Sequence, residues 1–182
     1  MKPTLNFRER LQQRISMDDI HEITYLTQGS DTLKQELYNL LFDDDEKVAY
    51  QAAWVFCHFS LYENKWLYKK QNAMIDEVMC CRHSGKRRLL LNLLYRQPLP
   101  NPPRIDFLDF CLEHLLLKEE LPGVQTLCMK LAYEMCRLIP ELRQELRSML
   151  EIMEPTLLVP SIRAVRKNIL KAMLAGKSLQ LY

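Results

Sequence analysis

Apolar residues recur at helical spacing in segments that repeat at almost constant intervals along the chain. Ala49, Arg87, Val124 and Ile162 occupy equivalent places in four such segments, with spacings of 38, 37 and 38 residues. Each segment follows another amphipathic stretch and a short polar or proline-bearing break. A period of this length with two helices per period is typical of solenoids, in which helix pairs stack on one another.

The pattern predicts an N-terminal pair of helices, over residues 4–15 and 18–28, followed by four more pairs. The expected pairs are 31–42 with 46–60, 64–81 with 85–97, 104–117 with 121–138, and 140–152 with 160–174. The corresponding repeats span 31–61, 62–97, 104–138 and 140–175. We expect residues 1–30 to cap the stack, the whole of 1–182 to form one domain, and the residues after Gly176 to fray.

The breaks between helices carry the residues that start and stop helices. Asp43, Asp44 and Asp45 precede the second helix of the first repeat, where carboxylates bond free N–H groups and meet the positive end of the helix dipole. Pro140 and Pro160 fit the first turn of a helix, where no N–H is needed. The proline cluster at 98–103 stops a helix, and we interpret it as a turn between repeats, with a domain boundary as the alternative.

Composition agrees with an all-α protein. Apolar residues make up 48% of the 182 positions, whereas glycine occupies only four. So little glycine disfavours phosphate-binding loops and tight hairpins, and a Leu-, Lys-, Arg- and Glu-rich remainder favours helix. A chain of this length buries roughly 70% of its unfolded surface, which is enough for a real core.

No targeting or membrane segment is expected. The first residues lead directly into an amphipathic stretch, and no later run approaches the ~18 apolar residues that a membrane span needs. Most of the cysteines lie within helical apolar patterns, where a free thiol acts as a small hydrophobic group; the six are Cys57, Cys80, Cys81, Cys111, Cys128 and Cys136. We therefore expect a cytoplasmic protein without disulfides and without membrane contact.

Charge differs between the two halves of the chain. Residues 1–80 carry 9 basic and 13 acidic side chains, whereas residues 81–182 carry 16 basic and 10 acidic ones. The net charge of the whole chain is only +2. An anionic partner would therefore be attracted to the C-terminal half.

The repeat resembles the HEAT repeats of the armadillo-type superfold. The resemblance rests on helix pairs of about 38 residues, on a proline that opens a first helix in Ile139–Leu142, and on the acidic turn before an Ala-rich helix in DDDEKVAYQAA. It covers roughly residues 31–175, although the second and third repeats lack the acidic turn. It implies a right-handed α-α superhelix of about four helix pairs whose second helices line a concave face.

The register of the repeat then nominates a candidate binding surface on the second helices. The positions one, five and nine residues beyond the register residue are Tyr50, Trp54, His58, Arg88, Asn92, Arg96, Gln125, Met129, Tyr133, Arg163, Lys167 and Lys171. Five of these twelve are basic and none is acidic. The alternative is an ordinary solvated or inter-repeat surface. Lys86 and Arg87 form a secondary basic patch. Cations at a helix N-terminus are unfavourable without an anion or acid nearby, so this patch is a second candidate for contact with an anion.

One enzymatic alternative comes from a further resemblance, to the HEAT-like DNA alkylation-repair glycosylases. Such enzymes hold a damaged base with aromatic side chains, an arginine and a carboxylate, and they stabilise charge near the glycosidic bond. The twelve positions supply aromatic and basic residues but no carboxylate. No motif of that family matches residue by residue, so enzymatic activity stays uncertain and is the less favoured hypothesis.

Metal binding is a further alternative with a weak pattern. Cys80, Cys81 and His83 lie within four residues, and Cys111 and His114 share a helix face, which permits a mixed Cys/His zinc site. Neither cluster has the paired CxxC spacing of a structural zinc module, so we predict no metal. Motifs for hydrolysis or nucleotide binding are also absent, and we expect no cofactor and no small-molecule substrate.

The sequence therefore favours a non-catalytic scaffold that binds a protein partner through a partly basic concave surface. Nucleic-acid binding is the first alternative, because basic residues contact phosphates and Tyr50 and Trp54 present rings on which bases stack. A structural protein with no function in this groove is the second.

Overall fold

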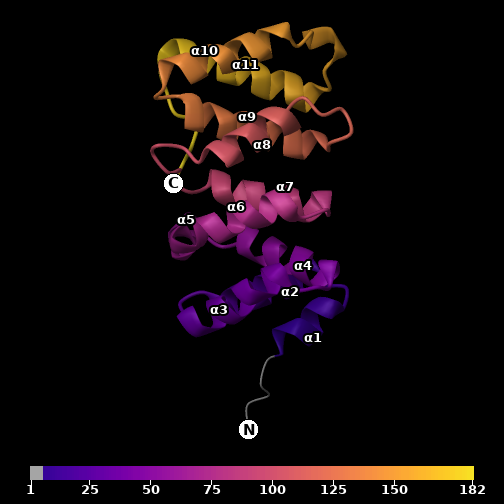
Figure 1. Cartoon of the computed structure of the whole chain (residues 1–182). Coiled ribbons are helices and arrows are strands. Elements are labelled where there is room, and N and C mark those ends of the chain that lie inside the picture. Colours follow the sequence, from indigo (N-terminus) through magenta and orange to yellow (C-terminus); the bar gives the residue numbers. More distant parts are fainter. Residues whose placement is uncertain (1–5) are drawn as a thin grey trace.

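The computed structural model describes residues 6–182, which form an elongated stack of helices (Figure 1). The first helices are α1 (Phe7–Gln12), α2 (Met17–Thr27), α3 (Asp31–Asn39) with a 3-10 turn η1 (Leu40–Phe42), and α4 (Glu46–Cys57). They correspond to the predicted N-terminal pair and first repeat. Residues 4 and 5 of the predicted 4–15 helix lie outside the described residues.

The remaining helices follow the predicted order with small shifts at their ends. They are α5 (Leu61–Asn64), η2 (Lys65–Lys70), α6 (Gln71–Cys80), α7 (Ser84–Tyr95), α8 (Ile105–His114), α9 (Pro122–Cys136), α10 (Pro140–Ile152), η3 (Pro155–Leu157) and α11 (Pro160–Ala175). The predicted all-α class is confirmed.

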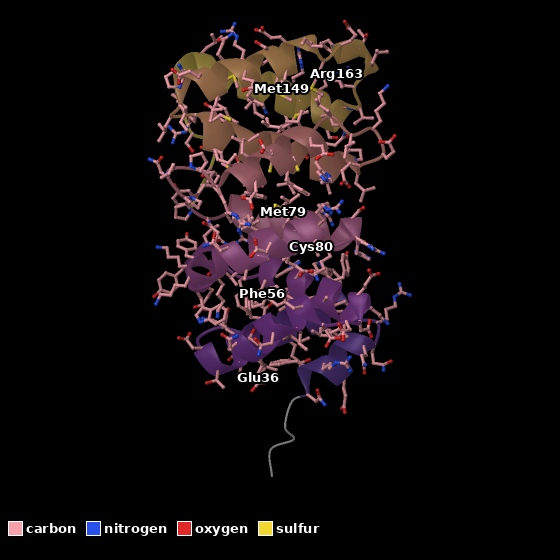
Figure 2. All side chains as sticks on the ribbon, viewed as in Figure 1. Glu36, Phe56, Met79, Cys80, Met149 and Arg163 are labelled. Atoms are coloured by element: carbon pink, nitrogen blue, oxygen red, sulfur yellow. The ribbon has the colours of Figure 1, made fainter. Side chains whose placement is uncertain are left out.

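The helices pack in two layers. The second helices of the repeats, α4, α7, α9 and α11, pack on one another in that order, and α6, α8 and α10 cover them on one side. One hydrophobic core extends from Phe7 to Met173, with Phe56 inside the stack (Figure 2). Across the proline cluster at 98–103, α6 contacts α8 and α7 contacts α9, as a turn between repeats requires.

Helix starts follow the predicted local chemistry. The Asp45 carboxylate caps α4 by accepting a hydrogen bond from the Lys47 N–H at 3.0 Å. Asp43 accepts the Asp45 N–H and pairs with Arg8 at 2.7 Å. Pro140 and Pro160 are the first residues of α10 and α11. These contacts confirm the interpretation of the acidic turn and of both prolines.

The continuous helix predicted over 64–81 is wrong, because η2 separates α5 from α6. Lys70, the last residue of η2, places its Nζ 4.6 Å from the ring centres of both Tyr38 and Trp66. The same Nζ donates a hydrogen bond to Gln35 Oε1 at 2.7 Å. The contacts of Lys70 with Tyr38 and Gln35 tie the segment to α3 where the tighter 3-10 helix meets α6.

The expectation that the chain frays after Gly176 is also wrong. Gly176 has φ +66°, in the left-handed region, and turns the chain off the end of α11. The following residues run back along the ends of α9 and α7 (Figure 1), held by hydrogen bonds to Tyr133, Glu134 and Tyr95. The anchoring groups lie far away in sequence, so the local sequence pattern does not predict that this segment is held.

Candidate functional site

The structure exposes the candidate surface on α4 and α7 but not on α9. Tyr50 and Trp54 on α4 are half-buried, as is Asn92 on α7, and Arg88 is exposed. The three candidates on α9 are buried, with exposed fractions of 7%, 0% and 0% for Gln125, Met129 and Tyr133. These three therefore do not belong to an exposed surface.

The reason is a register error of one residue on α9. Half-buried residues recur at an interval of 38, at Trp54, Asn92 and Lys130, and the same interval relates Arg88 to Thr126. The register residue Val124 lies only 37 residues after Arg87. A strictly constant interval of 38 would have found Thr126 and Lys130 in the sequence, and both were missed.

The candidates on α11 face the open end of the stack. Their counterparts one repeat earlier are covered: Gln125 and Met129 are 7% and 0% exposed, and Tyr133 Oη reaches the segment after α11. No helix follows α11 in the described chain, so Arg163, Lys167 and Lys171 are exposed there. Arg163 lies in this last layer (Figure 2). The last repeat of the described chain thus presents basic side chains on its outer face.

The residues that face outward on the second helices form one strip. We call Tyr50, Trp54, Arg88, Asn92, Thr126 and Lys130 the second-helix face. Tyr50 leans over Gly85, and an added Cβ there would lie 3.1 Å from its ring. Arg88 leans over Gly123 in the same way, and an added Cβ would lie 2.7 Å from its Cδ. In both cases a side chain of one repeat covers the glycine at the start of the second helix of the next repeat. The strip is therefore continuous from one repeat to the next.

At the carboxyl end of this strip, the candidates Arg96 and His58 make contacts within the chain itself. Arg96 donates hydrogen bonds to the carbonyls of Cys57 and Phe59 at 2.9 and 2.7 Å and so closes the end of α4. Burial and the nearby charges of His21 and Arg96 lower the pKa of His58. His58 is therefore a neutral, partly buried ring beside Trp54, at a centroid distance of 6.0 Å.

Electrostatically, the second-helix face is cationic. Of the helices that carry it, α4 contains the exposed Glu46, one turn before Tyr50, and α7 and α9 contain one acidic residue, Glu134. Its side chain is only 3% exposed, and its oxygens accept hydrogen bonds from Arg137, Ser178 and Leu179. Within residues 6–182, neither Arg88 nor Lys130 has an acidic partner, and Lys130 Nζ lies 5.4 Å from the Tyr95 ring centre. The strip therefore offers two cations and no carboxylate.

The secondary basic patch is not available to a ligand. Lys86 is 5% exposed, and its Nζ pairs with Glu77 at 2.5 Å. Arg87 pairs with Glu120 at 2.6 Å and donates to the Cys81 carbonyl. The unfavourable position of these cations at the start of α7 is thus compensated by two acids of the same chain, which the sequence does not show as neighbours.

The Cys/His clusters have structural roles. His83 Nδ1 accepts the Lys86 N–H at 3.0 Å and caps α7, and Cys81 Sγ contacts the Val78 carbonyl at 3.8 Å. Burial raises the pKa of Cys81, which keeps its thiol protonated. Cys111 is fully buried, and His114 Nδ1 lies 2.9 Å from the Glu120 carboxylate. Among residues 6–182, no three Cys, His, Asp or Glu side chains converge as metal ligands.

Comparison with known proteins bears on the architecture. No described helix combines the length and apolarity needed to cross a membrane. No curated protein and no solved structure is significantly similar to the chain. The family model of the HEAT repeat domain matches residues 7–173 and so includes the N-terminal helices that were expected to be an atypical cap. With two layers of paired helices and a match over most of its length, the chain belongs to the HEAT repeat domain family.

Proposed function

We propose that this HEAT repeat chain is a non-catalytic scaffold module that binds an acidic segment of a protein partner on its second-helix face. The proposal is carried by one observation, the strip of half-exposed aromatic and basic side chains that contains no acid. A partner carboxylate beside Arg88 or Lys130 would gain a charge-assisted hydrogen bond. Tyr50 and Trp54 supply rigid apolar area of the kind enriched in protein interfaces.

The chemistry of the strip fits binding better than catalysis. Cleavage of a glycosidic bond needs a carboxylate near the bond or an equivalent source of charge stabilisation. Glu134 does not supply one, because it is buried and its oxygens are already bonded. The module would then act by holding a partner, and its specificity would come from charge and from the two aromatic rings.

A charge reversal on the strip provides the test. We expect the double variant Arg88→Glu, Lys130→Glu to bind a fluorescein-labelled, Glu- and Asp-rich peptide at least tenfold more weakly than the native chain, which corresponds to about 1.4 kcal/mol. Fluorescence anisotropy at low salt measures both affinities. Wild-type helicity in circular dichroism would exclude unfolding as the cause.

A matched control reverses two charges elsewhere. Arg163→Glu, Lys167→Glu changes the net charge equally but acts at the open end of the stack, so we expect its affinity to stay within threefold of the native value. Equal losses in both double variants would contradict a specific strip. Tighter binding of single-stranded DNA, with a steep fall in affinity as salt increases, would favour the nucleic-acid alternative instead.

A further inference from the structure

The segment after α11 binds its own chain as an extended peptide. Tyr133 Oη donates a hydrogen bond to the Lys177 carbonyl at 2.5 Å, and Tyr95 Oη donates to the Leu179 carbonyl at 2.8 Å. The Leu179 N–H donates to Glu134 Oε1 at 2.6 Å. These three contacts involve only the main chain of the segment, so they would hold many sequences in the same place.

Two side chains of the segment add selectivity. Ser178 Oγ donates to Glu134 Oε2 at 2.9 Å. Gln180 Nε2 donates to the carbonyls of Tyr95 and Gln97, both at 2.8 Å, at the carboxyl end of α7. Helix ends leave such carbonyls without internal partners. The segment held in this way carries a hydroxyl residue followed two positions later by an amide residue.

The groups that bind the segment, which we call the receptor, are much more deeply buried than the segment itself, the occupant. Tyr133 is fully buried and the Glu134 side chain is 3% exposed, so both groups need a bonding partner. The occupant, by contrast, buries little: Lys177 and Ser178 are exposed, and no residue of 177–182 is fully buried. Hydrogen bonds, each worth about 0.5–1.5 kcal/mol net, thus hold the segment more than apolar contact does. Such an occupant is exchangeable, whereas the polar receptor must stay filled.

Open space continues on both sides of the segment. A cavity of about 260 Å³ lies between it and α11, lined by Lys171, Ala175 and Leu179 among others. Another of about 160 Å³ lies at its far end, beside Leu99, Leu138 and Tyr182. The chain's own residues therefore do not fill the groove that they follow.

The groove is formed by Tyr95, Gln97, Tyr133 and Glu134. We infer that it is a binding site for an extended peptide of a partner protein, with the pattern Ser/Thr-x-Gln. Residues 177–180 occupy the same groove as an internal competitor. The site lies at the carboxyl ends of α7 and α9 and uses none of the six residues of the second-helix face. Lys130 lies over the Tyr95 ring, so only Arg88 serves to separate the two proposals experimentally.

The test releases the internal segment within the full chain. Leu179→Pro with Gln180→Ala removes the N–H donor to Glu134 and the amide contacts with α7. We expect a fluorescein-labelled peptide with the sequence of residues 176–182 to bind this variant at least tenfold more tightly than the native chain. In the native chain, a tethered segment competes at an effective concentration near the millimolar range.

Two controls address specificity. The same peptide carrying Ser178→Ala and Leu179→Pro should lose binding, because it lacks both donors to Glu134. Tyr95→Phe in the released chain should weaken the intact peptide about fivefold, since the ring stays and only the donated hydrogen bond is lost. Arg88→Glu alone should not weaken this peptide, which separates the test from that of the second-helix face; Lys130 is left unchanged because its Nζ lies 5.4 Å from the Tyr95 ring centre.

A second measurement uses the unmodified chain. On addition of millimolar peptide, the Leu179 amide resonance of the isotope-labelled native protein should move toward its unfolded position as the segment is displaced. The proposal would be overturned by a folded, released variant that binds no peptide, or by a Leu179 resonance that stays fixed. Dimerisation of the native chain that Leu179→Pro abolishes would assign the groove to a second copy and would also overturn it.

Discussion

Two glycines, 38 residues apart, occupy the same place in successive repeats, the first turn of α7 and of α9. Gly85 lies under Tyr50 and beside the capping ring of His83, whereas Gly123 lies under the side chain of Arg88. Neither glycine has a positive φ, so the space above each one, and not its backbone conformation, limits which residue can replace it. What covers each glycine therefore decides how a larger residue is tolerated.

We predict opposite effects for alanine at these two positions. At Gly85 an added Cβ would lie 2.9 Å from His83 Cε1, so Gly85→Ala should displace the cap of α7 and lower the free energy of unfolding by about 0.5–1 kcal/mol. At Gly123 the obstacle is the flexible, exposed Arg88, which can move aside. Gly123→Ala should therefore raise the free energy of unfolding by about 0.5 kcal/mol, because the unfolded chain loses freedom. Urea unfolding measures both, and equal effects would contradict this account.

Individual elements of this chain depend on how their ends are satisfied. Helix α4 starts at an acidic turn in which Asp43 is tied to Arg8 and Asp45 caps the first N–H groups, whereas Asp44 is exposed. The hydrogen bonds from Arg8 and from the Asp45 N–H lower the pKa of Asp43. Three consecutive aspartates thus have three different environments at one helix end.

Alanine substitutions at Asp45 and Asp44 should show how differently these two aspartates contribute to stability. Asp45→Ala should lower the free energy of unfolding by about 1 kcal/mol, because the Lys47 N–H loses its acceptor. Asp44→Ala serves as the matched control and should change it by less than about 0.5 kcal/mol, as expected for an exposed residue without a cap bond. Thermal or urea unfolding would test the pair. A larger loss for Asp44→Ala would show that net charge matters more than capping.

At the scale of the whole molecule, the stack is held by contacts between successive repeats. Helix α7 packs on both α4 and α9, whereas α11, the last helix of the described chain, packs mainly on α9 and α10. In solenoids, stability is approximately a sum of repeat and nearest-neighbour interface contributions. A defect in α7 therefore weakens two interfaces at once.

We predict that Leu90→Ala on α7 lowers the free energy of unfolding by about 2–5 kcal/mol, because Leu90 is fully buried and its removal leaves a cavity. Hydrogen exchange should then lose protection in both α4 and α9. Leu174→Ala on α11 removes the same atoms from a side chain that is 78% exposed and should have almost no effect. Protection lost only in α7 would contradict the coupling between repeats.

The sequence pattern alone was sufficient for the order of the helices, though not for the break within 64–81, and for the acidic cap at Asp45 and the helix starts at Pro140 and Pro160. Each depends on residues a few positions apart, so periodicity and local hydrogen-bonding chemistry carry the information. Four of the six residues of the proposed second-helix face were already candidates from the sequence. Tyr50 and Arg88 lie on the strip, but Lys130 needed the constant interval that the burial pattern reveals.

The tertiary structure was needed wherever partners are distant along the chain. Glu120 neutralises Arg87 across 33 residues, and Glu134 holds Leu179 across 45. The open end of the stack leaves Lys167 exposed at a place where inner repeats are covered. A periodic pattern states which side of a helix is apolar, but it does not state what covers that side. Packing of separate repeats determines which charges stay free, and therefore which surface of this HEAT repeat chain can be proposed for binding.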